Sequence, residues 1–131
     1  MNRPLATLGM RHIALNARKL EECEHFYVVL LGMTVEWRPD DDNVYLTSGN
    51  DNLALHRAAG DVSPGPGQRL DHIGFFIASE EQVDAWYTFL SAHGVPVKSP
   101  PKTHRDGARS FYCSDPEGTM VQVIYHPPQS A

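Results

Sequence analysis

Apolar and polar residues alternate at the start of the chain, which predicts a β-strand over residues 10–16. One face of this strand is apolar, and His12 lies on the other face. From residue 18 to residue 31 the apolar positions change to helical spacing. Gly32 then supplies a stop, because glycine readily adopts the left-handed conformation that ends many helices. The chain therefore opens with a strand and an amphipathic helix.

Three short strands are predicted to follow this helix. The turn-forming cluster that begins at Pro39 and the polar stretch 48–52 separate three apolar segments from one another. These segments are residues 33–37, 44–47 and 53–57. The first half of the chain therefore has the predicted order β-α-β-β-β.

A glycine- and proline-rich stretch, residues 58–69, comes next. Such a composition supports neither a helix nor a central strand, so it predicts a linker. Alternation resumes over residues 70–77 and predicts another strand, in which His72 and Phe76 share one face.

A second helix is predicted between Ser79 and Gly94. Ser79 and Gln82 have the spacing of a capping box, which marks a helix start, and Gly94 marks its end. Three further strands complete a second β-α-β-β-β series, at residues 95–98, 109–113 and 119–125.

The two halves match each other in detail, which indicates an internal duplication. A His-Ile pair begins at His12 and again at His72. In each half an aromatic pair follows 14 residues later, at Phe26 and at Trp86. We therefore interpret the chain as two copies of one structural module.

Chain length decides how these modules are organised. A chain of 131 residues can form one compact domain but is short for two independent cores. We expect a single α+β domain over residues 1–131, built from two tandem βαβββ modules. Module one covers about residues 8–57 and module two about residues 70–126, joined by the linker.

Composition excludes several classes of function. The net charge of -5 disfavours tracking a phosphate backbone, so no nucleic acid partner is expected. No apolar run has the length of a signal sequence or a membrane span, which predicts a cytoplasmic protein with no membrane partner. Cys23 and Cys113 lack metal-type spacing and are interpreted as core residues.

Four sequence motifs give the repeat a specific resemblance. They are Phe-Tyr at 26–27, Leu-Gly-Met at 31–33, His-Ile-Gly-Phe at 72–75 and Asp-Pro-Glu-Gly at 115–118. Together they resemble the vicinal oxygen chelate superfamily, which comprises glyoxalases, bleomycin-resistance proteins and extradiol dioxygenases. The resemblance implies that two modules pair around a cleft, and that the protein forms a homodimer and binds a small-molecule substrate or ligand.

The resemblance also implies a set of metal ligands on the first and last strand of each module. His12 and His72 occupy the two first-strand positions. Gln122, four residues after Gly118, occupies the last-strand position of module two, where glutamate is commoner. In module one the register leaves two alternatives, Ala54 or, with a shift of two residues, His56. His56 is therefore a weaker candidate for a fourth ligand or a base.

These donors suit a divalent metal only in part. Imidazoles bind iron, nickel, cobalt, zinc or manganese, and such a centre can hold two adjacent substrate oxygens. The amide of Gln122 neither offsets the charge of the metal nor acts as a good base. A structural interpretation also stands, in which each histidine and Gln122 only forms hydrogen bonds within the sheet.

Two functions follow from these residues. The first is a metal-dependent enzyme acting on a small substrate with vicinal oxygens, either a glyoxalase-like lyase or isomerase or an extradiol-type dioxygenase. The second is a metal-free small-molecule binding protein like the bleomycin-resistance members. A cationic loop could in addition receive an anionic substrate, although such loops are more often merely solvated. Its residues are His104, Arg105, Asp106 and Arg109.

Overall fold

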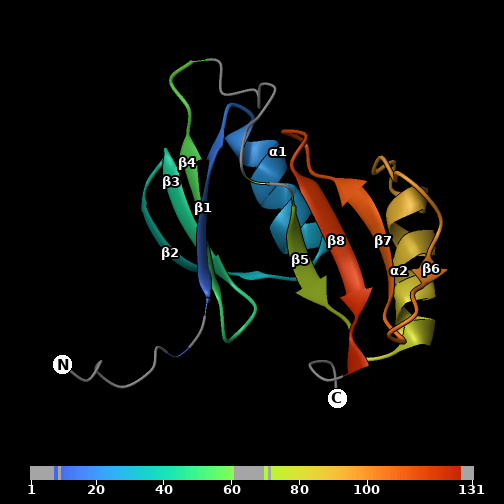
Figure 1. Cartoon of the computed structure of the whole chain (residues 1–131). Coiled ribbons are helices and arrows are strands. Elements are labelled where there is room, and N and C mark those ends of the chain that lie inside the picture. The colour runs from blue at the N-terminus through green and yellow to red at the C-terminus, as the bar shows by residue number, and fades with distance from the viewer. Residues whose placement is uncertain (1–7, 9, 61–69, 71, 128–131) are drawn as a thin grey trace. The chain divides into compact units, whose positions relative to one another are not determined.

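The computed structural model describes residue 8, residues 10–60, residue 70 and residues 72–127. The chain divides into two compact units, Met1–Val62 and Ser63–Ala131, and each unit has one sheet of four strands (Figure 1). In each unit a strand, a helical segment and three strands follow in that order. The predicted α+β fold of two tandem βαβββ modules is therefore confirmed. Most of the predicted linker, residues 61–69, lies outside the described residues.

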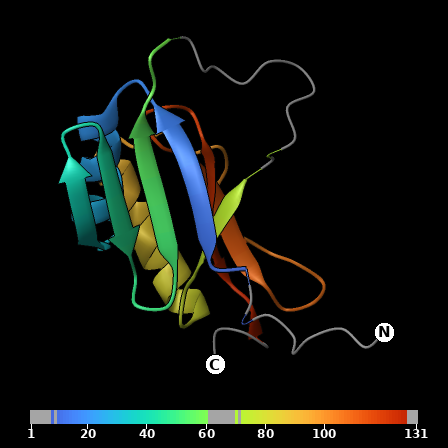
Figure 2. The same cartoon turned by 90° about the vertical axis from the view of Figure 1, so that its left-hand side faces the viewer.

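The first sheet has the strand order β1-β4-β3-β2, which Figure 2 shows face-on. Its strands are β1 (His12–Ala17), β2 (Thr34–Asp40), β3 (Asn43–Thr47) and β4 (Asn52–Arg57). β1 and β4 run parallel, and the other neighbours run antiparallel. Alternate residues of the central strands are buried toward the helical side and form the core of this unit. These residues are Val44, Leu46, Leu53 and Leu55.

The first helical segment differs from the regular helix that the periodicity predicts. An α-helix, α1 (Leu20–His25), continues as a π-helical segment, η1 (Phe26–Leu30). The N–H of Leu31 donates to the carbonyl of Phe26, five residues earlier, at 3.0 Å. The wider turn accommodates Phe26 and Tyr27 side by side in the core, and both are buried. The segment ends at Gly32, whose φ of 86° confirms the predicted stop.

β2 is longer than predicted. The sequence places its end at residue 37 and a turn at Pro39, but the strand continues to Asp40. Proline is tolerated here because β2 is an edge strand of the sheet and its pairing with β3 is irregular. The strand consequently brings Trp37 and Asp40 opposite residues of β3.

The second sheet has the order β5-β8-β7-β6. Its elements are β5 (Ile73–Phe76), α2 (Glu80–Ala92), β6 (Lys102–Thr103), β7 (Arg109–Ser114) and β8 (Met120–Tyr125). The predicted cap is confirmed, since Ser79 Oγ accepts the N–H of Gln82 at 3.2 Å. α2 contacts β7 and β8, and the ring of Tyr87 packs edge-on against the buried Phe111.

The strand predicted at residues 95–98 is wrong. Val97 forms only an isolated bridge with Cys113, and the strand beside β7 is β6 instead. Pro100 and Pro101 lack the N–H that a ladder requires, so they interrupt the pairing before it resumes at Lys102. The pairing at this edge is therefore divided into two short pieces.

Both cysteines are buried and neither forms a disulfide, which confirms their interpretation as core residues. Burial raises the pKa of the Cys113 thiol to about 12, and the negative charge of Asp115 contributes further. A thiol with this pKa stays protonated and unreactive near neutral pH.

Within the described residues, no helix combines the length and the hydrophobicity that a membrane crossing requires.

Candidate functional site

The face of the first sheet opposite α1 carries three rows of side chains that run across the strands. The register aligns His12 with Asn52 in the first row. The middle row contains Ala14, Ala54, Tyr45 and Trp37, and the third row contains Asn16, His56, Asn43 and Asp40. The apolar middle row therefore lies between two polar rows, and each polar row contains a histidine.

His12 belongs to a chain of hydrogen bonds that fixes its tautomer. Its Nδ1 lies 2.7 Å from Asn52 Oδ1, and Asn52 Nδ2 donates to Glu36 Oε1 at 2.9 Å. An ionised carboxylate only accepts hydrogen bonds, so Asn52 turns its NH2 group toward Glu36 and its oxygen toward the ring. His12 Nδ1 must then carry the proton. In the neutral ring, Nε2 consequently keeps the lone pair that a metal ion requires.

His56 has an equivalent arrangement in the third row. Its Nδ1 lies 2.6 Å from Asn43 Oδ1, and Asn43 Nδ2 donates to Asp40 at 2.9 and 3.1 Å. The backbone N–H of Asp42 and then the Asn43 side chain lower the pKa of Asp40, which keeps this carboxyl group ionised. His56 therefore also holds its proton at Nδ1 and presents Nε2 as a hydrogen-bond acceptor.

The strand register shows which residue of module one matches Gln122. Gly74, two residues after His72, pairs with Gln122. Ala14, two residues after His12, pairs with Ala54. Ala54 is therefore the counterpart of Gln122, and His56 lies two residues further along the same face of β4. Of the two alignments that the sequence allows, the structure supports the unshifted one.

The face of the second sheet opposite α2 holds Gln122 in one orientation. Gln122 Nε2 donates to Ser110 Oγ at 3.2 Å, and His104 Nε2 lies 3.3 Å from the same hydroxyl. Because the NH2 group points toward β7, the amide oxygen lies on the β5 side. Gly74 leaves that oxygen uncovered, since a Cβ there would stand 3.9 Å from it.

His72 immediately precedes β5 and shares the face of Gln122 through the alternation of the strand. Its ring packs edge-on against Tyr112, with 5.3 Å between the ring centroids. The predicted ligands thus come from both units, His12 from the first and His72 and Gln122 from the second. Across the described ranges, no group of three or more His, Cys, Asp or Glu side chains could hold a metal ion.

The structure also identifies supporting residues that the sequence analysis missed. Asn52, Glu36, Asn43 and Ser110 all orient a candidate side chain. Polar residues of this kind are common in strands and turns, so their types carry no signal. Only the register, which places Asn52 opposite His12 and Asn43 opposite His56, distinguishes them.

Replacing Asn52 with alanine is expected to release the ring of His12 from its single tautomer. The change removes the acceptor of the Nδ1 proton, so both neutral tautomers become populated in metal-free protein. Imidazole 15N shifts measured above the His titration range report this directly, and Asn16→Ala on the same face is the matched control. Loss of such a partner typically lowers metal affinity about 10- to 100-fold. Unchanged 15N shifts in Asn52→Ala would contradict the role of Asn52.

Comparisons with known proteins agree with this architecture. The sequence model of the Glyoxalase/Bleomycin resistance protein/Dioxygenase superfamily matches residues 9–123. A comparison with curated proteins found no match.

Solved structures similar to the chain include three with related names. A lactoylglutathione lyase from Agrobacterium tumefaciens is 24% identical, with 95% of this chain and 98% of that chain covered and a TM-score of 0.75. A glyoxalase/dioxygenase from Nostoc punctiforme is 22% identical, with 97% and 99% covered and a TM-score of 0.78. A possible glyoxalase from Bacillus cereus is 25% identical, with 90% and 99% covered and a TM-score of 0.73.

The family match spans both sheets and every candidate residue named above. The similar structures cover nearly the whole length of both chains in each pair, so the shared fold includes both modules. The chain therefore belongs to the glyoxalase/bleomycin resistance protein/dioxygenase superfamily.

Proposed function

We propose that the protein is a metal-dependent enzyme acting on a small substrate with two adjacent oxygen atoms. The observation that carries this proposal is the hydrogen-bond chain from Glu36 through Asn52 to His12. Protein ligands to metals almost always have such an outer partner on the second ring nitrogen, because it fixes the tautomer and orients the ring. The same arrangement leaves His12 Nε2 available to an ion.

The ligands that we propose for a divalent ion are His12, His72 and Gln122. Two imidazoles suit iron, nickel, cobalt, zinc or manganese, and the amide oxygen of Gln122 adds a neutral third ligand. Ser110 supports this role, since it turns the NH2 group of Gln122 away and leaves the oxygen for the ion. When bound, the ion would hold two substrate oxygens and stabilise negative charge on them.

His56 is the proposed proton acceptor, because Gln122 has no basic atom. The Nε2 lone pair of His56 is kept available by Asn43, and the carboxylate of Asp40 stabilises the charge that develops when the ring is protonated. A glyoxalase-like lyase or isomerase and an extradiol-type dioxygenase both move a proton, so this assignment suits either reaction. The likeness to a lactoylglutathione lyase favours the lyase.

The proposal also covers the oligomeric state, the cellular location and the partners of the protein. We propose a homodimer in the cytoplasm, on the grounds of the superfamily to which the chain belongs. The expected partner is a small molecule rather than nucleic acid or a membrane.

A second candidate function is metal-free binding of a small planar ligand, as in bleomycin-resistance proteins. Trp37 is 58% exposed and stacks on Tyr45, with 5.1 Å between the ring centroids. The row continues with Ala54, which is buried, and then with Ala14, which is exposed, so the two aromatic rings form most of the accessible surface of this apolar strip. Such a strip suits a planar ligand and requires no metal.

Substituting Gln122→Glu tests whether Gln122 is a metal ligand. A carboxylate offsets the charge of the ion, so metal affinity is expected to rise about tenfold or more. Competition with a chromophoric chelator measures the change. Gln82→Glu, which adds the same charge on the exposed side of α2, is the control and should change nothing. Equal affinity in Gln122→Glu and wild type would remove Gln122 from the ligand set.

A further inference from the structure

The turn between β6 and β7 forms a shaped loop. Lys102 pairs with Ser110 across the two strands. The N–H of His104 then donates to the carbonyl of Ala108 at 2.7 Å, and the N–H of Gly107 donates to the carbonyl of His104 at 3.0 Å. Gly107 has a φ of 88°, a conformation that closes the turn and that other residues rarely adopt. The loop geometry is therefore set by its own backbone.

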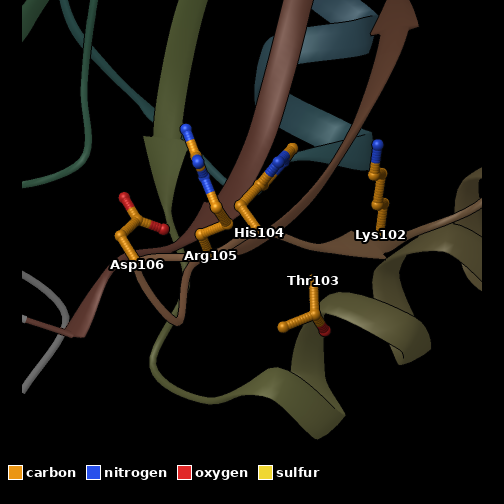
Figure 3. A pocket seen from close by; sticks show the side chains of 5 residues that line it. All are labelled: Lys102, Thr103, His104, Arg105 and Asp106. Atoms are coloured by element: carbon orange, nitrogen blue, oxygen red, sulfur yellow. The ribbon is translucent and has the colours of Figure 1, made fainter.

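This loop borders a solvent-open hollow of about 570 Å³, whose five lining residues are all exposed. Its lining residues are Lys102, Thr103, His104, Arg105 and Asp106. Figure 3 shows Lys102, His104 and Arg105 extending to one side of the hairpin, while Thr103 points to the other. The volume lies within the range of small-molecule sites, about 300–1,000 Å³.

Two cationic side chains at this hollow belong to no ion pair within the described residues. Arg109 is engaged elsewhere, since it binds Asp84 and Thr103. In the part of the chain that the structure describes, the side chains of Lys102 and Arg105 form neither a hydrogen bond nor an ion pair.

Asp106, the acidic residue of the loop, forms a hydrogen bond within the loop. Asp106 Oδ1 accepts the N–H of Ala108, which ties this carboxylate into the turn. Asp106 keeps its negative charge, so Lys102 and Arg105 leave the hollow with a net charge of +1 in a chain whose net charge is -5. Such a local reversal of sign attracts anions selectively.

We propose that the hollow of the β6–β7 hairpin binds an anionic group, a carboxylate or a phosphate, of the substrate. The planar guanidinium of Arg105 suits both groups, because it can donate two parallel hydrogen bonds to their oxygens. Lys102 adds a point charge. His104 still has Nδ1 available for the ligand, while its Nε2 faces Ser110.

The position of the hollow relates it to the proposed ligand Gln122. Ser110 stands opposite Lys102 and contacts the side chains of both His104 and Gln122. Neighbouring strands are about 5 Å apart, so the hollow lies within roughly 10 Å of the Gln122 amide. An anionic group bound here belongs to the same small substrate, an inference that rests on the proposed function.

Titration of metal-free protein with inorganic phosphate and, separately, with acetate tests this site. Sodium chloride keeps the ionic strength constant, and backbone 1H–15N shifts are followed. We expect saturable shifts confined to residues 102–110. Lys102→Gln and Arg105→Gln should each weaken binding about tenfold, whereas Lys98→Gln, which removes the same charge outside the loop, should not. The stronger of the two probes identifies the substrate group as phosphate or carboxylate.

Three results would overturn the proposal. They are shifts that do not saturate, unchanged affinity in Lys102→Gln, and an equal loss of affinity in Lys98→Gln. Because no metal is present, this result is independent of the metal site. A protein that binds phosphate but no metal would retain the anion site and lose the proposed enzyme. A protein that binds metal but neither anion would retain the proposed enzyme and lose the anion site.

Discussion

Alanine at His12 or at His72 is expected to weaken divalent metal binding by at least about 100-fold, because loss of an outer partner alone costs about 10- to 100-fold. Each change removes one of only two imidazoles from the proposed ligand set, and neither Ala54 nor Gln122 can replace it. Affinity is measured by competition with a chromophoric chelator on folded protein.

His25→Ala is the matched control for both variants. His25 is an exposed histidine at the end of α1, so its loss should leave the affinity unchanged. Equal weakening in all three variants would indicate scattered surface binding. Weakening in only one of the two site variants would show that the other histidine belongs to no shared metal site.

Phe111→Ala is expected to lower the free energy of unfolding by about 3–5 kcal/mol, the usual cost of removing a buried phenylalanine ring. Phe111 is 1% exposed on the helical side of β7, where its ring packs against Tyr87 of α2. The loss leaves a cavity between the sheet and the only helix that covers it in the described part of this unit. Urea denaturation followed by circular dichroism measures the change.

Phe76→Ala is the control for this substitution. Phe76 is 58% exposed on the opposite face of the sheet and stacks on His126. Its removal should cost less than about 1.5 kcal/mol, since little apolar area leaves the core. Similar losses in the two variants would contradict the assignment of the core to the helical side of the sheet.

Much of the fold could be predicted because the chain repeats itself. The 14-residue offset from His12 to Phe26, and again from His72 to Trp86, places a strand and a helix at matching positions in both halves. Period-two and helical patterns then assign the elements, since each buries one face. These local signals are strong because every side chain in them faces either the core or the outside.

The errors fall where pairing rather than pattern decides the structure. The apolar residues at 95–98 resemble a strand, but adjacent prolines at 100–101 move the regular pairing to Lys102. The change from α1 to η1 has no signal in periodicity, because it depends on backbone hydrogen bonds that span five residues, such as the one from Leu31 to Phe26. β2 passes through Pro39 only because it is an edge strand.

The candidate ligands could be predicted from the sequence, whereas the residues that orient them could not. His12, His72 and Gln122 could be named from the sequence because motifs of a family point to their positions. Asn52 is 40 residues from His12 in the chain and becomes its partner only through the parallel pairing of β1 with β4. The hydrogen-bond chain that fixes the tautomer is therefore a property of the register.

Elemental mass spectrometry on wild-type protein tests directly whether the chain binds a divalent metal. The protein should be purified without a histidine tag, stripped of metal, reconstituted separately with iron, nickel, cobalt, zinc and manganese, and desalted. We expect close to one ion per chain for at least one of these metals. Folded protein that retains none of them would contradict the metal-dependent enzyme and favour metal-free binding on the aromatic rings of Trp37 and Tyr45.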